Sequence, residues 1–258
     1  MSATTATSAA PPSPTTKAAL YHPTVGRLTY RALLGGRRAL MLFALPALLL
    51  VISALVRALT GADDATAHDL LEHLGLAGVV PLVGVIAGTG AIGPEIDDGA
   101  IVYLLAKPVR RSTIVSTKLL IASGVTAAFC VLPVLLAGYF LDGGSQRLAI
   151  AYAAAAAVAS VGYAAIFLML GVFTRHAVIV GLVYALVWEG LIGTEVPGAR
   201  TLSVQQWSLA VAEKVGHGGL VTSDVALPTA LALLVAVTGA SIWYAIRRLR
   251  TLKLAGEE

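Results

Sequence analysis

Residues 93–118 read GPEIDDGAIVYLLAKPVRRSTIVSTK and separate two apolar runs, 74–92 and 119–141, neither of which contains a charged residue. A helix needs about 20 residues to cross roughly 30 Å of hydrocarbon, and both runs approach that length. We therefore predict that the charged stretch connects two transmembrane helices on one side of a bilayer.

Outward from this connection the same pattern repeats. Six apolar runs predict six transmembrane helices: 39–59, 74–92, 119–141, 148–173, 177–194 and 225–246. The fifth run is the shortest and contains Glu189. Of the 258 residues, 57% are hydrophobic and 12% are charged, whereas soluble domains carry about 25% charged residues. The expected fold is an all-α polytopic membrane protein, and this composition argues against a disordered chain or a soluble enzyme.

The basic residues favour one orientation. With both termini cytoplasmic and an even number of spans, 14 of the 18 lysines and arginines face the cytoplasm: Lys17, Arg27, Arg31, Arg37, Arg38, Lys107, Arg110, Arg111, Lys118, Arg175, Arg247, Arg248, Arg250 and Lys253. Cytoplasmic loops carry such an excess in membrane proteins. We predict an N-in, C-in protein with a disordered cytoplasmic tail at 1–21 and a transmembrane domain at 22–258.

Arg27 and Arg31 fall on one helical face ahead of the first span. They predict either a short helix lying at the membrane surface or a basic stop before the span. Within span two, Gly84 and Gly88 form a GxxxG pair, whose small residues let helix backbones approach closely.

The central connection predicts a short helix. Asp97 and Asp98 suit a helix start, Lys107 suits a last turn, and Pro108 stops the helix. The segment between them includes Leu104 and Leu105 and is too short to span a bilayer. Such a helix, flanked by Arg110 and Arg111, either lies in the lipid interface or docks into a groove of a partner protein.

This run resembles the membrane subunits of type-2 ATP-binding-cassette (ABC-2) transporters. The matching residues, in order, are Glu95, Gly99, Leu104, Leu105, Lys107, Pro108, Val109 and Arg111. Residues 24–38, 188–191 and 202–203 also look like this family. The resemblance implies that about 95–111 form the coupling helix, which sits in a cleft of the ATPase subunit. Its coupling residues would be Glu95, Asp97, Asp98, Gly99, Leu104, Leu105, Lys107, Pro108, Arg110 and Arg111.

The chain contains no GxxxxGK[ST] phosphate loop, so a separate subunit must bind any ATP that powers it. The resemblance implies a non-enzymatic permease of an exporter in a bacterial cytoplasmic membrane. Its partners would be an ABC ATPase, which holds ATP and Mg, a second permease copy and the lipid bilayer. We expect no cofactor in this chain and no nucleic-acid partner.

On the outer side, residues 203–216 predict an interfacial helix. Ser203 and Gln206 form a capping-box pattern, and Trp207 suits the headgroup layer. A gate or a lid facing the substrate is the alternative interpretation of this segment.

Several polar residues outside the coupling segment are also candidates. Glu189 is the one carboxylate well inside a predicted span, so it either takes part in substrate, proton or helix contacts or lies close enough to the outer interface to be hydrated. His68, Asp69, Glu72 and His73 crowd the outer start of span two. A solvated helix start is favoured there over a metal site, because no further ligands converge.

Three other functions stay open at this point. A secondary transporter driven by an ion gradient usually shows internal repeats and ionisable groups at the membrane midplane, and only Glu189 fits that description. A membrane enzyme needs convergent catalytic groups, for which only the histidine cluster is available. A non-transporting membrane scaffold would need only the partner-docking helix.

Overall fold

The computed structural model describes residues 21–99, 110–141, 146–193, 196–216, 219 and 221–251. All regular structure in these ranges is helical. The first half contains, in order, α1 Pro23–Leu33, α2 Arg37–Thr60, α3 Asp64–Leu70, the π-helix η1 Leu71–Val79, α4 Val80–Gly90 and α5 Gly93–Asp97. The second half contains α7 Arg111–Leu141, α8 Gln146–Phe173, α9 Ala177–Val183, the π-helix η2 Tyr184–Ile192, α11 Pro197–Arg200, α12 Val204–Gly216 and α13 Leu227–Thr251.

Five helices among the described residues are long and apolar enough to cross a membrane: Arg38–Thr60, Asp64–Ile96, Arg111–Leu141, Gln146–Phe173 and Leu227–Leu249. They correspond to predicted spans one to four and six. The fifth predicted span forms the shorter apolar helix Ala177–Ile192, which is seven residues of α-helix followed by nine of π-helix. The all-helical membrane fold is confirmed, whereas the predicted count of six full spans is not.

Span two begins ten residues earlier than its apolar run because the helix continues through polar residues. Asp63 caps it, accepting hydrogen bonds from the backbone N–H and the hydroxyl of Thr66 at 3.0 and 2.8 Å. The acidic and histidine residues from 68 to 73 therefore lie on the helix itself, at one end of the bundle.

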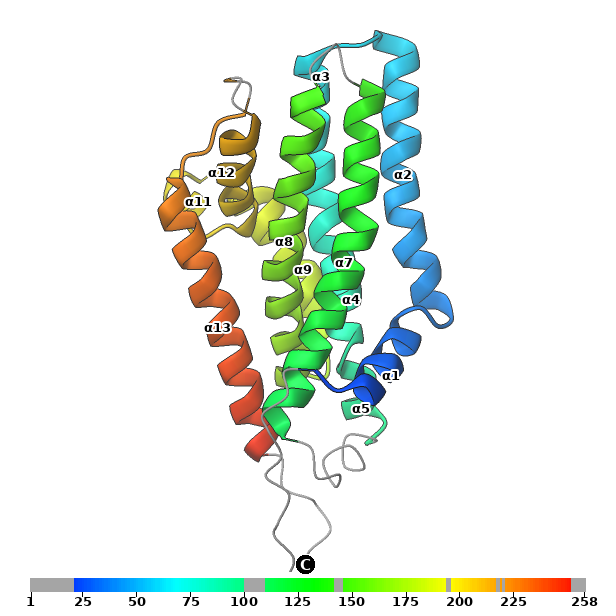
Figure 1. Cartoon of the computed structure of the whole chain (residues 1–258), viewed down its shortest axis with the longest axis vertical. Coiled ribbons are helices and arrows are strands. Elements are labelled where there is room, and N and C mark those ends of the chain that lie inside the picture. Colours follow the sequence, from blue (N-terminus) through cyan, green and yellow to red (C-terminus); the bar gives the residue numbers. More distant parts are fainter. Residues whose placement is uncertain are drawn as a thin grey trace, which may run out of the picture.

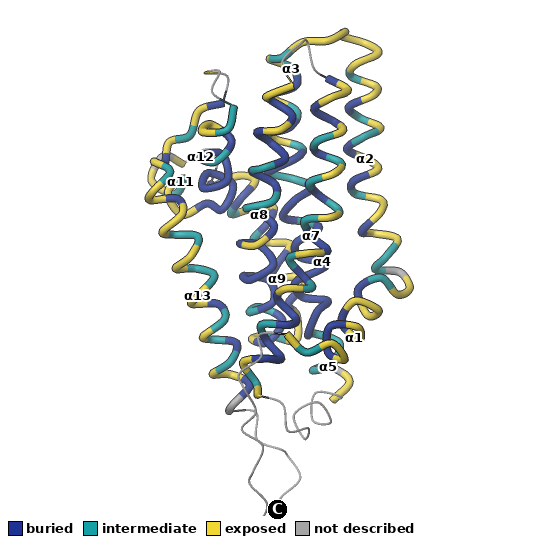
Figure 2. Tube along the Cα trace, viewed as in Figure 1, coloured by how far each residue is buried: buried dark blue, intermediate teal, exposed yellow. Residues whose placement is uncertain are grey.

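Helix α8 lies at the centre and packs against α4, α7, α12 and α13 (Figure 1). Small residues make this close packing possible: a Cβ added at Gly88 would lie 2.6 Å from the Cβ of Phe167, and one at Gly138 would lie 2.6 Å from the Cβ of Ala149. Helices α4 and α8 are largely buried, whereas α2 and α13 flank the bundle and are largely exposed (Figure 2). Their exposed apolar side chains, such as Phe43, Leu55 and Val235, suit contact with lipid.

Helices α1 and α5 and the last turn of α13 lie at one end of the bundle, and α3 lies at the other (Figure 1). Both α8 and α13 run toward the end that carries α1. The chain between them, which includes α9, η2 and α12, must therefore return from one end of the bundle toward the other.

Candidate functional site

Near α5, a buried ion pair ties the beginning of the central connection to α7. Lys118 Nζ lies 2.7 Å from Glu95 Oε1 and donates to the carbonyl oxygen of Ala91 at 2.5 Å. The same ammonium lies 3.5 Å from Thr29 Oγ1 of α1. One cation therefore joins α1, the end of α4 and α5 to the first third of α7.

The side chain of Lys118, which the sequence predicts to be among the basic residues facing the cytoplasm, is fully buried. A lysine is buried in this way only when its charge is paired and hydrogen-bonded. Glu95 supplies that pair and keeps a side-chain exposure of 25%, while its Oε2 is buried and accepts no hydrogen bond from the described residues.

The other side of the connection is tied to α13. Arg111, the first residue of α7, donates from Nη1 to the carbonyl oxygen of Leu249 at 2.8 Å. This bond places a cation on a carbonyl in the last described turn of α13, where the helix dipole favours positive charge. Both ends of the connection are thus attached to membrane helices.

The acidic pair in this connection lies at the end of α5. Asp97 closes α5 and Asp98 is its C-cap, followed by Gly99 in the left-handed region at φ 69°. That sequence of conformations ends a helix. The predicted start of a further helix at this pair concerns residues 100–109, outside the described part of the structure, and stays a prediction. Asp98, Gly99 and Arg110 are exposed. The side chain of Asp97 and residues 100–109, with Leu104, Leu105, Lys107 and Pro108, lie outside the described part of the structure.

Glu189 is fully buried and accepts four hydrogen bonds. Its Oε1 accepts from the Tyr184 hydroxyl at 2.9 Å and the Val204 N–H at 3.1 Å. Its Oε2 accepts from the Ser203 hydroxyl at 2.6 Å and the Gln205 N–H at 3.3 Å. The carboxylate therefore caps the N-terminus of α12, where backbone N–H groups lack helical partners and negative charge is favoured. Its four hydrogen bonds to protein groups make it a link between η2 and α12.

The local sequence explains this geometry. Ser203 uses its hydroxyl twice, donating to Glu189 and accepting from the Gln206 N–H at 3.4 Å, as the capping-box pattern predicts. A Cβ at Gly193 would lie 3.0 Å from the Cβ of Ser203, so the glycine permits the close approach. Helix α12 packs on α8, and Trp207 is only 2% exposed, with its Nε1 donating to the Thr201 carbonyl. This burial differs from the expected place of Trp207 in the headgroup layer.

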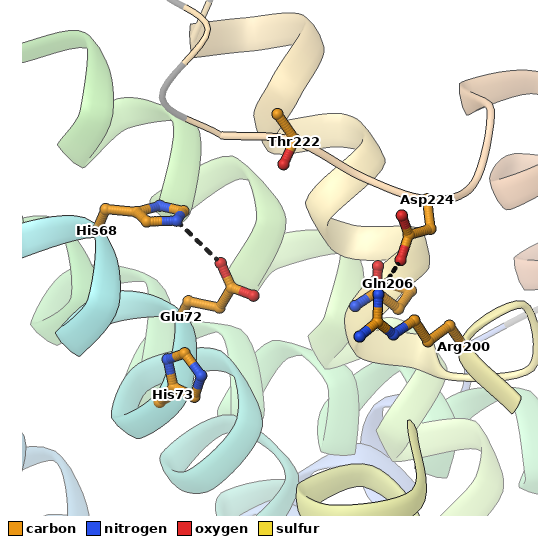
Figure 3. A pocket seen from close by; sticks show the side chains of 7 residues that line it. All are labelled: His68, Glu72, His73, Arg200, Gln206, Thr222 and Asp224. Atoms are coloured by element: carbon orange, nitrogen blue, oxygen red, sulfur yellow. Dashed lines mark hydrogen bonds and ion pairs between the residues drawn. The ribbon is translucent and has the colours of Figure 1, made fainter. Parts of the chain in front are cut away.

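The polar cluster at the α3 end of span two lines a cavity of about 290 Å³ (Figure 3). His68, Glu72 and His73 lie on one side, and Arg200, Gln206, Thr222 and Asp224 lie across from them. His68 Nε2 lies 3.4 Å from Glu72 Oε2, and its Nδ1 lies 2.7 Å from the hydroxyl of Tyr152. Opposite, Arg200 and Asp224 form an ion pair at 2.6 Å.

The polar side chains of this cluster form these contacts with other groups of the protein. His73 Nδ1 lies 3.0 Å from the backbone carbonyl oxygen of Asp69. Within the described ranges, no group of three or more His, Cys, Asp or Glu side chains is arranged to hold a metal ion.

The fold and these contacts define a multi-pass helical membrane protein whose polar groups connect helices at both ends of a bundle. A family model described as "ABC-2 family transporter protein" matches residues 44–194, more than half of the chain. The chain belongs to this family and is a membrane permease component of an ABC transporter. The family implies association with an ABC ATPase. A search of curated proteins gives no match.

Proposed function

We propose that this chain is the permease subunit of an ABC exporter in a bacterial cytoplasmic membrane. A separate ATPase subunit binds and hydrolyses ATP with Mg, and a second permease copy completes the transport pathway. The bundle crosses the membrane six times with both termini cytoplasmic, residues 22–258 forming the permease domain.

Two observations support the six crossings. Helices α8 and α13 both run toward the end of the bundle that carries α1 (Figure 1), so the chain between them returns across the bundle. Helix α9 and η2 begin this return as a short apolar helix, and the buried α12 lies beyond it. The excess of basic residues toward the α1 end supports a cytoplasmic location for that end.

The observation that carries the proposal is the attachment of the central connection at both of its ends. Glu95 and Lys118 join it to α4, α7 and α1, and Arg111 joins it to α13. A buried ion pair in a medium of low dielectric constant is a stiff link, because separating the charges is costly. A displacement of either end of the connection would therefore be passed to the membrane-associated helices bonded to that end.

In this mechanism the apolar residues Leu104 and Leu105 occupy a groove of the ATPase. When ATP closes the two ATPase subunits, the connections of the two permease copies move with them, and the paired bundles switch access from one side of the membrane to the other. This is a rigid-body transition of the kind that domain closure produces in other switching proteins.

The proposal is tested by the double substitution Leu104→Asp/Leu105→Asp in the tagged full-length chain. We expect the variant to insert normally but to lose co-purification of an ATPase carrying GxxxxGK[ST], because two carboxylates cannot enter an apolar groove unpaired. The matched control is Leu202→Asp, an exposed leucine at the other end of the bundle, which should retain the ATPase. Retention by the double variant would contradict docking through this segment.

A further inference from the structure

An apolar groove of about 370 Å³ lies between α1, α2 and α7. Tyr30 and Leu34 line it from α1, Phe43 from α2, and Gly124 and Phe129 from α7. The rings of Phe43 and Phe129 meet edge to face with centroids 4.8 Å apart. Gly124 leaves open space, since a Cβ built there meets no atom within 4 Å.

The groove has the length of an acyl-chain site. Its lining on α7 extends from Leu120 to Phe129. At 1.5 Å per residue this is about 13.5 Å, close to one leaflet of a hydrocarbon core roughly 30 Å thick. The mainly apolar lining favours an apolar ligand over a polar one.

The α1 side of the groove is positively charged. Arg27, Tyr30, Arg31 and Leu34 stand at helical spacings of three and four, so they share one face of the chain at α1. Tyr30 and Leu34 line the groove, and both arginines are exposed. Across the described ranges, neither guanidinium forms an ion pair with a carboxylate.

We propose that this groove binds an anionic phospholipid. One acyl chain lies along α7 between Phe43 and Gly124, and the phosphate is held by Arg27 and Arg31. Guanidinium groups suit this role because they bind phosphate with two parallel hydrogen bonds. The neighbouring Arg38 is already engaged, donating from Nη1 to the carbonyl oxygen of Gly90 at 3.4 Å. The inference requires only that the chain lies in a bilayer and is independent of ATP coupling and of transport direction.

The experiment is native mass spectrometry of the full-length protein in detergent, titrated with dioleoyl phosphatidylglycerol or with phosphatidylcholine. The wild-type protein should bind phosphatidylglycerol in a saturable manner and more tightly than phosphatidylcholine. Arg27→Gln/Arg31→Gln should remove this preference, about fivefold per arginine, while leaving phosphatidylcholine binding unchanged. Gly124→Leu should fill the groove and weaken binding of both lipids at least tenfold.

Two controls separate the groove from general effects. Gly239→Leu adds the same side chain at an exposed glycine of α13, where a Cβ likewise meets no atom within 4 Å. Arg147→Gln/Arg175→Gln removes the same amount of charge from exposed positions away from the groove. Both should bind like the wild type. Equal affinity for the two lipids in the wild-type protein would overturn the proposal. Efficient disulfide cross-linking between copies through Gly124→Cys would also overturn it, because a second copy would then cover the groove.

Discussion

At the scale of single residues, two buried charges organise the molecule. Lys118 lies at the end of the bundle that carries α5, and Glu189 lies at the N-terminus of α12. Each is surrounded by partners that come from other helices or from distant positions in the chain. Burying an ionised group without such partners costs several kcal/mol, so the partners are as important to the fold as the charges.

Glu189→Gln should destabilise the protein while keeping its shape. An amide presents one oxygen and one NH2 group, so two of the four donors around the carboxylate lose their acceptor. Each unsatisfied buried donor costs about 1–3 kcal/mol. The measurement is thermal unfolding in detergent together with hydrogen exchange of the first turn of α12, which should lose protection.

The matched control is Glu213→Gln, which makes the same chemical change at an exposed position of the same helix. It should shift stability by less than about 0.5 kcal/mol. If Glu189→Gln leaves stability and exchange unchanged but abolishes transport, the carboxylate has a chemical role and does not serve mainly to cap α12.

Glu95 and Lys118 should show strong coupling in a double-mutant cycle. Glu95→Gln leaves the ammonium buried without a counter-charge and should cost about 3 kcal/mol, the lower end of the range for a broken buried pair, because Glu95 is partly exposed. Glu95→Gln/Lys118→Met removes both charges. Its loss of unfolding free energy should be smaller than the sum of the two single losses by at least about 1 kcal/mol. If chemical unfolding gives a double-variant loss equal to the sum of the two single losses, Glu95 and Lys118 are not energetically coupled.

The sequence predicts the types of these residues better than their environments. Glu189 stands out as a carboxylate in an apolar run, but three of its four hydrogen-bond donors lie 14 to 16 residues further on, beyond a reversal of the chain. The sequence predicts the capping box at Ser203 and Gln206, but it does not predict that Ser203 also donates a hydrogen bond to Glu189. The sequence predicts only that Lys118 faces the cytoplasmic side. No pattern near Lys118 indicates that Glu95, 23 residues earlier, packs beside it.

At the scale of helices, close packing of α4 on α8 depends on glycine. Gly88→Ala would place a methyl group 2.6 Å from Phe167 Cβ and 3.1 Å from its carbonyl carbon. Because backbone cannot move aside easily, we expect a loss of about 1–3 kcal/mol from overpacking. Gly124→Ala in α7 makes the same change in open space and should not lower stability. Equal melting temperatures of the two variants would contradict tight contact between α4 and α8.

Hydropathy predicts most of the helices because backbone in lipid must satisfy its own hydrogen bonds. Four predicted spans have close counterparts in α2, α7, α8 and α13, with ends that differ by several residues. Span two is longer than its apolar run because Asp63 caps a polar extension that hydropathy does not detect. The fifth predicted span forms the helix Ala177–Ile192, and its second half is π-helical, which no residue pattern in 184–192 indicates.

The two π-helices belong to neighbouring parts of the fold. η1 lies within span two and contacts η2, which carries Glu189. Such segments occur frequently at functional sites because they widen the helix and change the direction of its side chains. Here η2 turns Glu189 toward the N-terminus of α12.

At the scale of the whole molecule, contacts attach the connection between α5 and α7 to the bundle at one end, and the polar cavity opens at the other. The sequence predicted the connection from its charges and the family resemblance. It did not predict the cavity, because residues near 70, 200 and 222 meet only after folding (Figure 3). If this cavity lies on the transport pathway, we expect ATP-driven movement of the connection to change access to it.

The most direct measurement is the rate at which a membrane-impermeant maleimide, added from outside, labels Gln206→Cys in a Cys130→Ala background. Gln206 lines the cavity and is 7% exposed, and the chain has one native cysteine. With the ATPase partner assembled, labelling should differ severalfold between the nucleotide-free state and the state trapped by MgATP and vanadate. Labelling of Thr60→Cys, an exposed position at the end of α2 that does not line the cavity, should stay constant. Equal labelling of Gln206→Cys in both states, with ATP hydrolysis intact, would contradict an ATP-driven permease that works through this cavity.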